Sequence, residues 1–88
     1  MNVLASDQVA MSNHYAKKSE HDLLDDHYRI GKSGAPVLRG ALTSFECETW
    51  AHYDGGDHII VVGKVIEMDC KPGAKPLVFH AGQYRELR

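Results

Sequence analysis

Apolar and polar residues alternate along the second half of the chain. From Thr43 to Tyr53, every second residue falls on one face of a predicted strand, and the residues between them form a more polar face. The next strand runs from His58 to about Met68, and its apolar start is typical of a strand buried on both faces. Asp54-Gly55-Gly56-Asp57 between them predicts a tight turn, since glycine adopts positive φ without steric cost.

A second turn follows the apolar strand. Residues 70–76, with the sequence CKPGAKP, predict this turn, and residues 77–80 predict a short last strand before a break at Gly82. We therefore expect residues 37–88 to form a three-stranded β-meander. A meander that stands alone has two open edges, which tend to pair with another chain.

The first part of the chain is more polar. Residues 1–18 predict the end of a strand followed by a short helix, with Gln8, Met11 and Tyr15 on one helix face. Ser6 or Asp7 offers a side-chain oxygen suited to cap the first helical turn. Residues 19–36 show no period and contain two glycines and a proline, so we expect a loop.

Size and composition limit what the chain can be. Its 88 residues form at most one domain, and a chain this short buries only ~60–65% of its unfolded surface. We therefore expect a marginal core and a partner subunit, most simply in a homodimer. A formal net charge of −2 argues against a nucleic-acid binder.

The sequence also bears on compartment and membranes. No apolar run approaches the ~20 residues that cross a bilayer, and residues 1–8 lack the regions of a signal peptide. Cys47 and Cys70 stand without paired spacing, which indicates reduced thiols. We expect a cytoplasmic protein that binds neither membranes nor nucleic acid.

Motifs for metal, phosphate or nucleophile chemistry are weak. The six histidines form no helical i, i+4 pair and no His-x-His pair, so we expect no metal site. Gly55-Gly56 is followed by a strand rather than a helix, unlike a phosphate-binding loop. His58 directly follows this turn, where its ring can present a donor or a cation to a ligand. The simpler alternative is that His58 only ends the sheet edge.

Several motifs occur in a fixed order: G-x-P-x-L-x-G-A-L at Gly34–Leu42, FEC at Phe45–Cys47, GDH at Gly56–His58, Gly63, and PL-x-FH-x-G-x-Y at Pro76–Tyr84. Together they resemble the flavin reductase-like, FMN-binding split-barrel family. Its members are the NAD(P)H:flavin oxidoreductase components of two-component monooxygenases. The stretch NVLASDQVAMSNHYA is similar to the strand end and helix of this family. Two residues depart from it: Tyr15 replaces a phenylalanine, and His27 stands at a basic position.

The resemblance implies a mainly β fold with a short helix, forming the C-terminal part of an FMN-binding split β-barrel. Residues 1–88 would then be one partial domain. The implied activity is NAD(P)H-dependent reduction of FMN or FAD, which supplies a partner monooxygenase. The flavin carries the redox chemistry, so no side chain need act as a nucleophile.

The resemblance also implies roles for individual residues. His58 matches the histidine associated with nicotinamide-nucleotide binding and hydride transfer, which makes it the implied catalytic residue. Tyr84 matches an aromatic residue near the same site. The backbone that lies beside the flavin corresponds to Asn2, Val3, Leu4, Ala5 and Ser6.

Family members are considerably longer, and their N-terminal half supplies most flavin contacts. The chain resembles the C-terminal half alone, whether as a truncated gene, a cleavage product or a fragment. An isolated chain without flavin reductase activity is consistent with this resemblance. The alternative function is a non-catalytic split-barrel module that dimerises or binds flavin weakly. A structural β-protein without a ligand would require the ordered motifs to be coincidence.

Overall fold

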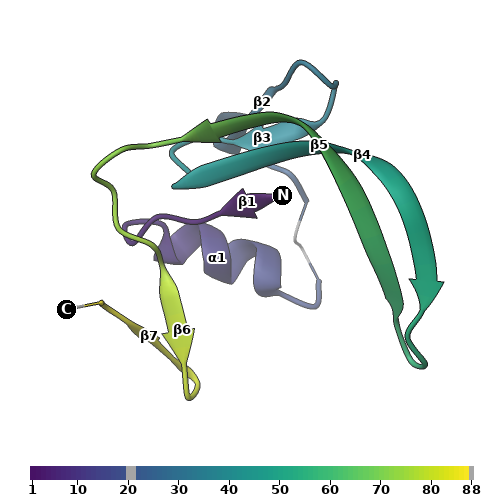
Figure 1. Ribbon diagram of the computed structural model, residues 1–88. Coiled ribbons are helices and arrows are strands. Elements are labelled where there is room, and N and C mark those ends of the chain that lie inside the picture. The colour runs from purple at the N-terminus through teal and green to yellow at the C-terminus, as the bar shows by residue number, and fades with distance from the viewer. Residues whose placement is uncertain (20–21, 88) are drawn as a thin grey trace.

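The computed structural model describes residues 1–19 and 22–87 of the chain. In order, the elements are β1 (Asn2–Val3), α1 (Val9–Ala16), the short 3-10 helix η1 (Asp25–His27), β2 (Tyr28–Ile30), β3 (Pro36–Leu38), β4 (Thr43–Asp54), β5 (Ile59–Cys70), β6 (Val78–His80) and β7 (Gln83–Arg85) (Figure 1). The strands form three antiparallel sheets with the orders β1-β4-β5, β2-β3 and β6-β7. The predicted class, mainly β with a short helix, is confirmed.

β4 and β5 form one long hairpin, as the two strand patterns and the turn between them predict. They pair along their whole length, with two register shifts that bend the ladder. At the turn, Gly56 has a φ of 86°, and its N–H donates to the Asp54 carboxylate at 3.0 Å. Figure 1 shows this turn standing clear of α1 and of the other sheets.

The last predicted strand does not complete a meander. β6 pairs with β7 rather than with β5, and β1 takes the free edge of β4. Residues 72–76 contain two prolines, which lack the N–H groups that continued pairing with β5 would need. The chain crosses instead to the end of β1, where the Leu77 N–H donates to the Leu4 carbonyl at 2.9 Å. Ala81 and Gly82, with φ of 52° and 77°, then form the tight β6–β7 turn.

The expected loop at residues 19–36 is more ordered than predicted. η1, β2 and the start of β3 lie within it, and β2 pairs with β3 in an antiparallel hairpin. The prediction of a loop is therefore wrong for these elements, because strands of three residues are too short to show a period. Positions 20 and 21 of this segment lie outside the described residues.

The helix begins directly after Gln8, and no side chain caps its first turn, so the prediction of a cap at Ser6 or Asp7 is wrong. The Gln8 side chain makes a different connection. It accepts a hydrogen bond from the Ala5 N–H at 2.9 Å and donates one to the Arg39 carbonyl at 2.8 Å. The start of α1 is thereby tied to the turn that follows β3.

The described residues bury little apolar surface. Ala5 and Val37 are 3% and 5% exposed, and they are the buried apolar residues of this part of the chain. β5 was predicted to be buried on both faces, but it is an edge strand here. Its exposed apolar side chains are Ile59, Ile60, Val61, Val62, Val65, Ile66 and Met68. A large apolar hairpin is therefore left uncovered by the rest of the chain.

A buried carboxylate joins the β2–β3 turn to β4. Glu46 accepts hydrogen bonds from the Ser33 hydroxyl at 2.6 Å and from the Ser33 N–H at 3.0 Å. A Cβ on Gly31 would overlap this carboxylate, so the glycine permits the close approach. The hydroxyl and the N–H of Ser33 hold the pKa of Glu46 below its ordinary value of 4.5, because both stabilise the charged form.

We predict that this carboxylate makes the fold sensitive to acid. Because the folded-state pKa is lowered, the stabilisation is complete above the unfolded-state value near 4.5 and is lost as pH falls through the folded-state pKa. Glu46→Gln should lower the melting temperature at neutral pH and flatten its decline in acid, as measured by circular dichroism. Glu48→Gln, at an exposed site on the same strand, should leave both unchanged. Identical pH profiles for the wild type and Glu46→Gln would contradict the prediction.

Candidate functional site

The stretch Asn2–Ser6 lies between α1 and β4 (Figure 1). The Asn2 side-chain oxygen accepts hydrogen bonds from the Leu38 N–H at 3.2 Å and from the Ser44 hydroxyl at 2.9 Å, which joins β1 to both β3 and β4. Further along, the Ser6 N–H donates to the Lys75 carbonyl at 2.8 Å. Contacts from several segments therefore determine the position of this backbone.

A hollow of about 430 Å³ opens beside this stretch, between β1, α1 and β3. Its lining is mostly apolar and includes Leu4 and Leu38. The polar groups that line it are the Asn2 amide and the hydroxyls of Ser12 and Tyr15. A hollow of this size, with a few polar groups among apolar ones, suits a small aromatic ligand.

Tyr84 approaches α1 from β7. Its hydroxyl lies 2.9 Å from both the Ser12 hydroxyl and the Asn13 side-chain oxygen, and its ring meets Phe79 edge to face at 5.3 Å. Ser12 also lines the hollow beside Asn2. The structure thus brings Tyr84 and the Asn2–Ser6 stretch to the same helix.

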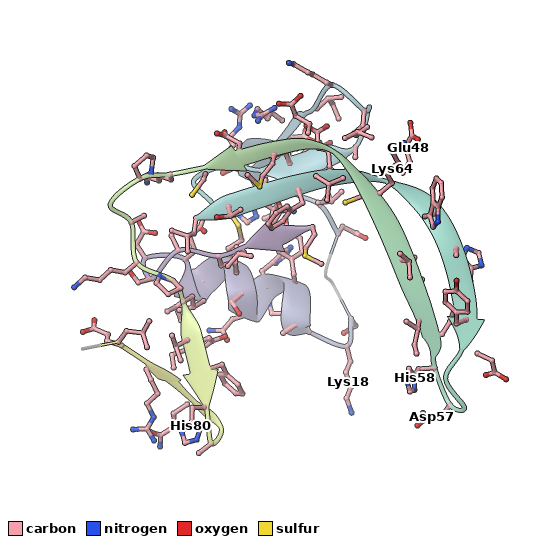
Figure 2. The ribbon with its side chains drawn as sticks, viewed as in Figure 1. Lys18, Glu48, Asp57, His58, Lys64 and His80 are labelled. Atoms are coloured by element: carbon pink, nitrogen blue, oxygen red, sulfur yellow. The ribbon has the colours of Figure 1, made fainter. Side chains whose placement is uncertain are left out.

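His58 lies elsewhere, at the end of the β4–β5 hairpin. Its side chain is 63% exposed, and its Nδ1 lies 2.8 Å from the Asp57 carboxylate. Figure 2 shows this pair at the hairpin end, apart from His80 on β6. The described chain therefore does not bring His58 to the hollow beside Asn2–Ser6.

A contact that the sequence pattern did not indicate links α1 to η1. The Tyr15 hydroxyl lies 2.9 Å from Nδ1 of His27. Within α1, the ring of Tyr15 also meets the ring of His14 edge to face at 4.7 Å. The Leu24 N–H donates to the same hydroxyl at 3.4 Å, which adds a second contact between Tyr15 and the segment around η1. The two departures from the family pattern, Tyr15 and His27, therefore form one interaction.

The described part of the chain contains neither a metal-binding cluster nor a membrane-spanning helix. Over residues 1–19 and 22–87, no three His, Cys, Asp or Glu side chains gather as metal ligands would. No helix within those same ranges has the length and apolar character needed to cross a membrane.

Known proteins similar to the chain point to one family. A family model described as "Flavin reductase like domain" matches residues 1–88. The FMN reductase (NADH) SmoA of Agrobacterium fabrum is 36% identical over 85 residues, which is 96% of this chain and 47% of that protein. The reductase subunit HsaB of a flavin-dependent monooxygenase from Mycobacterium tuberculosis is 31% identical over 86 residues, which is 96% of this chain and 46% of that protein. The chain spans about half the length of these curated relatives.

The fold has a counterpart among solved structures. The NADH:FAD oxidoreductase SgcE6 of Streptomyces globisporus, in complex with NAD and FAD fragments, superimposes with a TM-score of 0.90 at 31% identity. The superposition covers 99% of this chain and 53% of that one. The architecture of Figure 1 is thus that of about half of this oxidoreductase.

We predict that Tyr84 stabilises the packing of β7 on α1. Tyr84→Phe keeps the ring and removes the hydroxyl that contacts Ser12 and Asn13. The free energy of unfolding should fall by about 0.5–1.5 kcal/mol, as for the loss of one neutral hydrogen bond. Denaturant titration measures this loss. Tyr53→Phe, at a tyrosine that is 58% exposed on β4, should have little effect, and equal losses for the two variants would contradict the prediction.

Proposed function

The chain belongs to the flavin reductase-like domain family, and on this premise we propose that it is the C-terminal half of an NAD(P)H-dependent flavin reductase. The observation that carries the proposal is the likeness of nearly the whole chain, in sequence and in fold, to a reductase in complex with NAD and FAD fragments. The motif resemblance is thereby confirmed at the level of the family. The proposed reaction passes a hydride from NAD(P)H to FMN or FAD, and the reduced flavin would serve a partner monooxygenase.

We assign the flavin to the hollow beside Asn2–Ser6. The residues fit a flat ring system, because the lining is mostly apolar and the Asn2 amide and two hydroxyls offer hydrogen bonds at its wall. The flavin would supply the electron-accepting ring. The chain's own contribution is to hold that ring, through a backbone already braced by Leu38, Ser44 and Lys75, and to keep water from one face.

His58 is assigned to the nicotinamide nucleotide, and Tyr84 to support of the flavin hollow through Ser12. With Nδ1 of His58 against Asp57, Nε2 is the nitrogen left for a ligand. Nε2 lies over Gly55, where a Cβ would approach it to 2.6 Å, so the glycine leaves room for the imidazole ring in this position. His58 is remote from the hollow within the chain, and this assignment therefore requires a second copy or an N-terminal half to complete the site.

A non-catalytic module is the second candidate function. The exposed apolar face of β5 and the small core favour it for the chain taken alone. Such a module would dimerise or bind flavin weakly, without turnover.

We predict that the chain restores flavin reduction when it is combined with the N-terminal half of a reductase such as SmoA. The mixture should bind FMN on gel filtration and oxidise NADH in its presence, because the two halves together make a complete barrel. Each half alone serves as the control. Flavin binding without NADH oxidation would favour the non-catalytic module, and the absence of both would contradict the reductase.

In that complemented protein, His58→Ala should weaken the use of NADH. The loss corresponds to one hydrogen bond, about 0.5–1.5 kcal/mol to a neutral partner or ~1.5–3 kcal/mol to a charged one. Flavin affinity should change much less, and stability should stay within about ±0.5 kcal/mol because the side chain is exposed. His52→Ala, at an exposed position of the same hairpin, is the matched control. An unfolded variant, or an unchanged KM and kcat for NADH, would refute the assignment.

We also predict that the chain self-associates, as a homodimer. The face of the hairpin that carries Val61 and Val65 is apolar and exposed, and its burial against a second copy would remove it from water. Light scattering should give a mass above that of one chain, and Val61→Lys should lower it. His80→Lys, which adds the same charge on β6, should not. A monomeric wild type with a cooperative melt would overturn this prediction.

A further inference from the structure

A second hollow, of about 380 Å³, lies between the β2–β3 hairpin and the open end of the β4–β5 hairpin. Three cationic residues line it: Arg29 on β2, Arg39 after β3 and Lys71 after β5. Asp69 is the carboxylate in the lining. The hollow therefore carries a net charge of +2 in a chain whose formal net charge is −2.

The three cations form no ion pair within the described ranges, and the charge of Arg29 also interacts with the Glu46 carboxylate on β4. The ion pairs found there join Lys32 to Glu67 and His58 to Asp57, and no carboxylate oxygen lies within 4.0 Å of a side-chain nitrogen of Arg29, Arg39 or Lys71. A cluster of unpaired cations on a fixed scaffold raises the local concentration of anions.

The backbone that carries these cations is held in place. Arg29 lies within the β2–β3 ladder. The Arg39 N–H donates to the His27 carbonyl at 2.7 Å, and the Lys71 N–H donates to the Leu42 carbonyl at 2.8 Å. Segments far apart in the sequence are thus anchored around one hollow before any ligand binds.

The turn between Arg39 and β4 adds neutral donors. Gly40 has a φ of 75°, a conformation that favours glycine. Gly40 and Ala41 both line the hollow, and neither N–H donates to an acceptor among the residues that the structure describes. Free backbone N–H groups in a turn of this kind are a common element of anion sites.

We propose that this hollow binds a phosphoryl group. The planar guanidinium of arginine matches two phosphate oxygens at once, and the lysine ammonium and the Gly40 and Ala41 amides can reach the others. A phosphate dianion balances the net charge of +2. The hollow is larger than one phosphate, which leaves room for an adjoining sugar. The site does not depend on the reductase activity.

The test uses the 88-residue chain and inorganic phosphate at constant ionic strength, followed by heteronuclear NMR. The amide signals of Gly40 and Ala41 should shift and saturate. Arg39→Gln should raise the Kd by about tenfold or more, as expected for the loss of a charged hydrogen bond, and Lys71→Gln should act in the same direction. Asp69→Asn should tighten binding, because it removes the opposing charge. Lys64→Gln, on β5 and outside the lining of both hollows, is the control and should change nothing.

FMN and riboflavin, which differ by the phosphate, distinguish the sources of the phosphoryl group. Tighter binding of FMN than of phosphate, with riboflavin leaving the two amides unshifted, would assign the hollow to a nucleotide phosphate. Equal affinities for FMN and phosphate would assign it to free phosphate. Shifts that do not saturate, or a Kd that is unchanged in both Arg39→Gln and Lys71→Gln, would overturn the proposal.

Discussion

Residues 2–8 connect the three sheets formed by the residues that the structure describes. β1 pairs with β4, and the Asn2 side chain reaches both β3 and β4. Leu4 then receives the segment that leads into β6, and Gln8 ties the start of α1 to the turn after β3. These contacts are mostly hydrogen bonds, and the described chain buries few apolar side chains beside them. The fold is therefore organised by hydrogen bonds along one short segment rather than by a large core.

That arrangement determines what the rest of the structure can do. The contacts along residues 2–8 shape the hollow between β1, α1 and β3. Other backbone hydrogen bonds, in the turns after β3 and β5, anchor Arg39 and Lys71 around the second hollow. Leu38 lines both hollows, so β3 separates them. The long β4–β5 hairpin takes no part in this network beyond its open end. Its apolar side chains consequently remain exposed, and His58 lies outside the lining of both hollows.

Much of the fold and part of the candidate site could be predicted from the sequence. The motifs identified the family, and the turn at Asp54–Asp57 was placed correctly. Asn2–Ser6 and Tyr84, which the resemblance singled out, do meet at α1. The contact of Tyr15 with His27 gave no signal, because the residues lie on different elements and share no spacing rule. The pairing of β6 with β7 was missed because a short strand does not reveal its neighbour.

The sequence by itself determined the elements whose patterns are long, namely β4, β5 and the turn between them. β4 alternates over its twelve residues and β5 begins with a run of apolar residues, and both patterns are typical of an extended strand. Only the tertiary structure decided which strands became neighbours and which distant residues met. Arg29, Arg39 and Lys71 are ordinary surface cations in the sequence, and they form a cluster because three separate turns and ladders converge. Such convergence depends on long-range hydrogen bonds that no local pattern encodes.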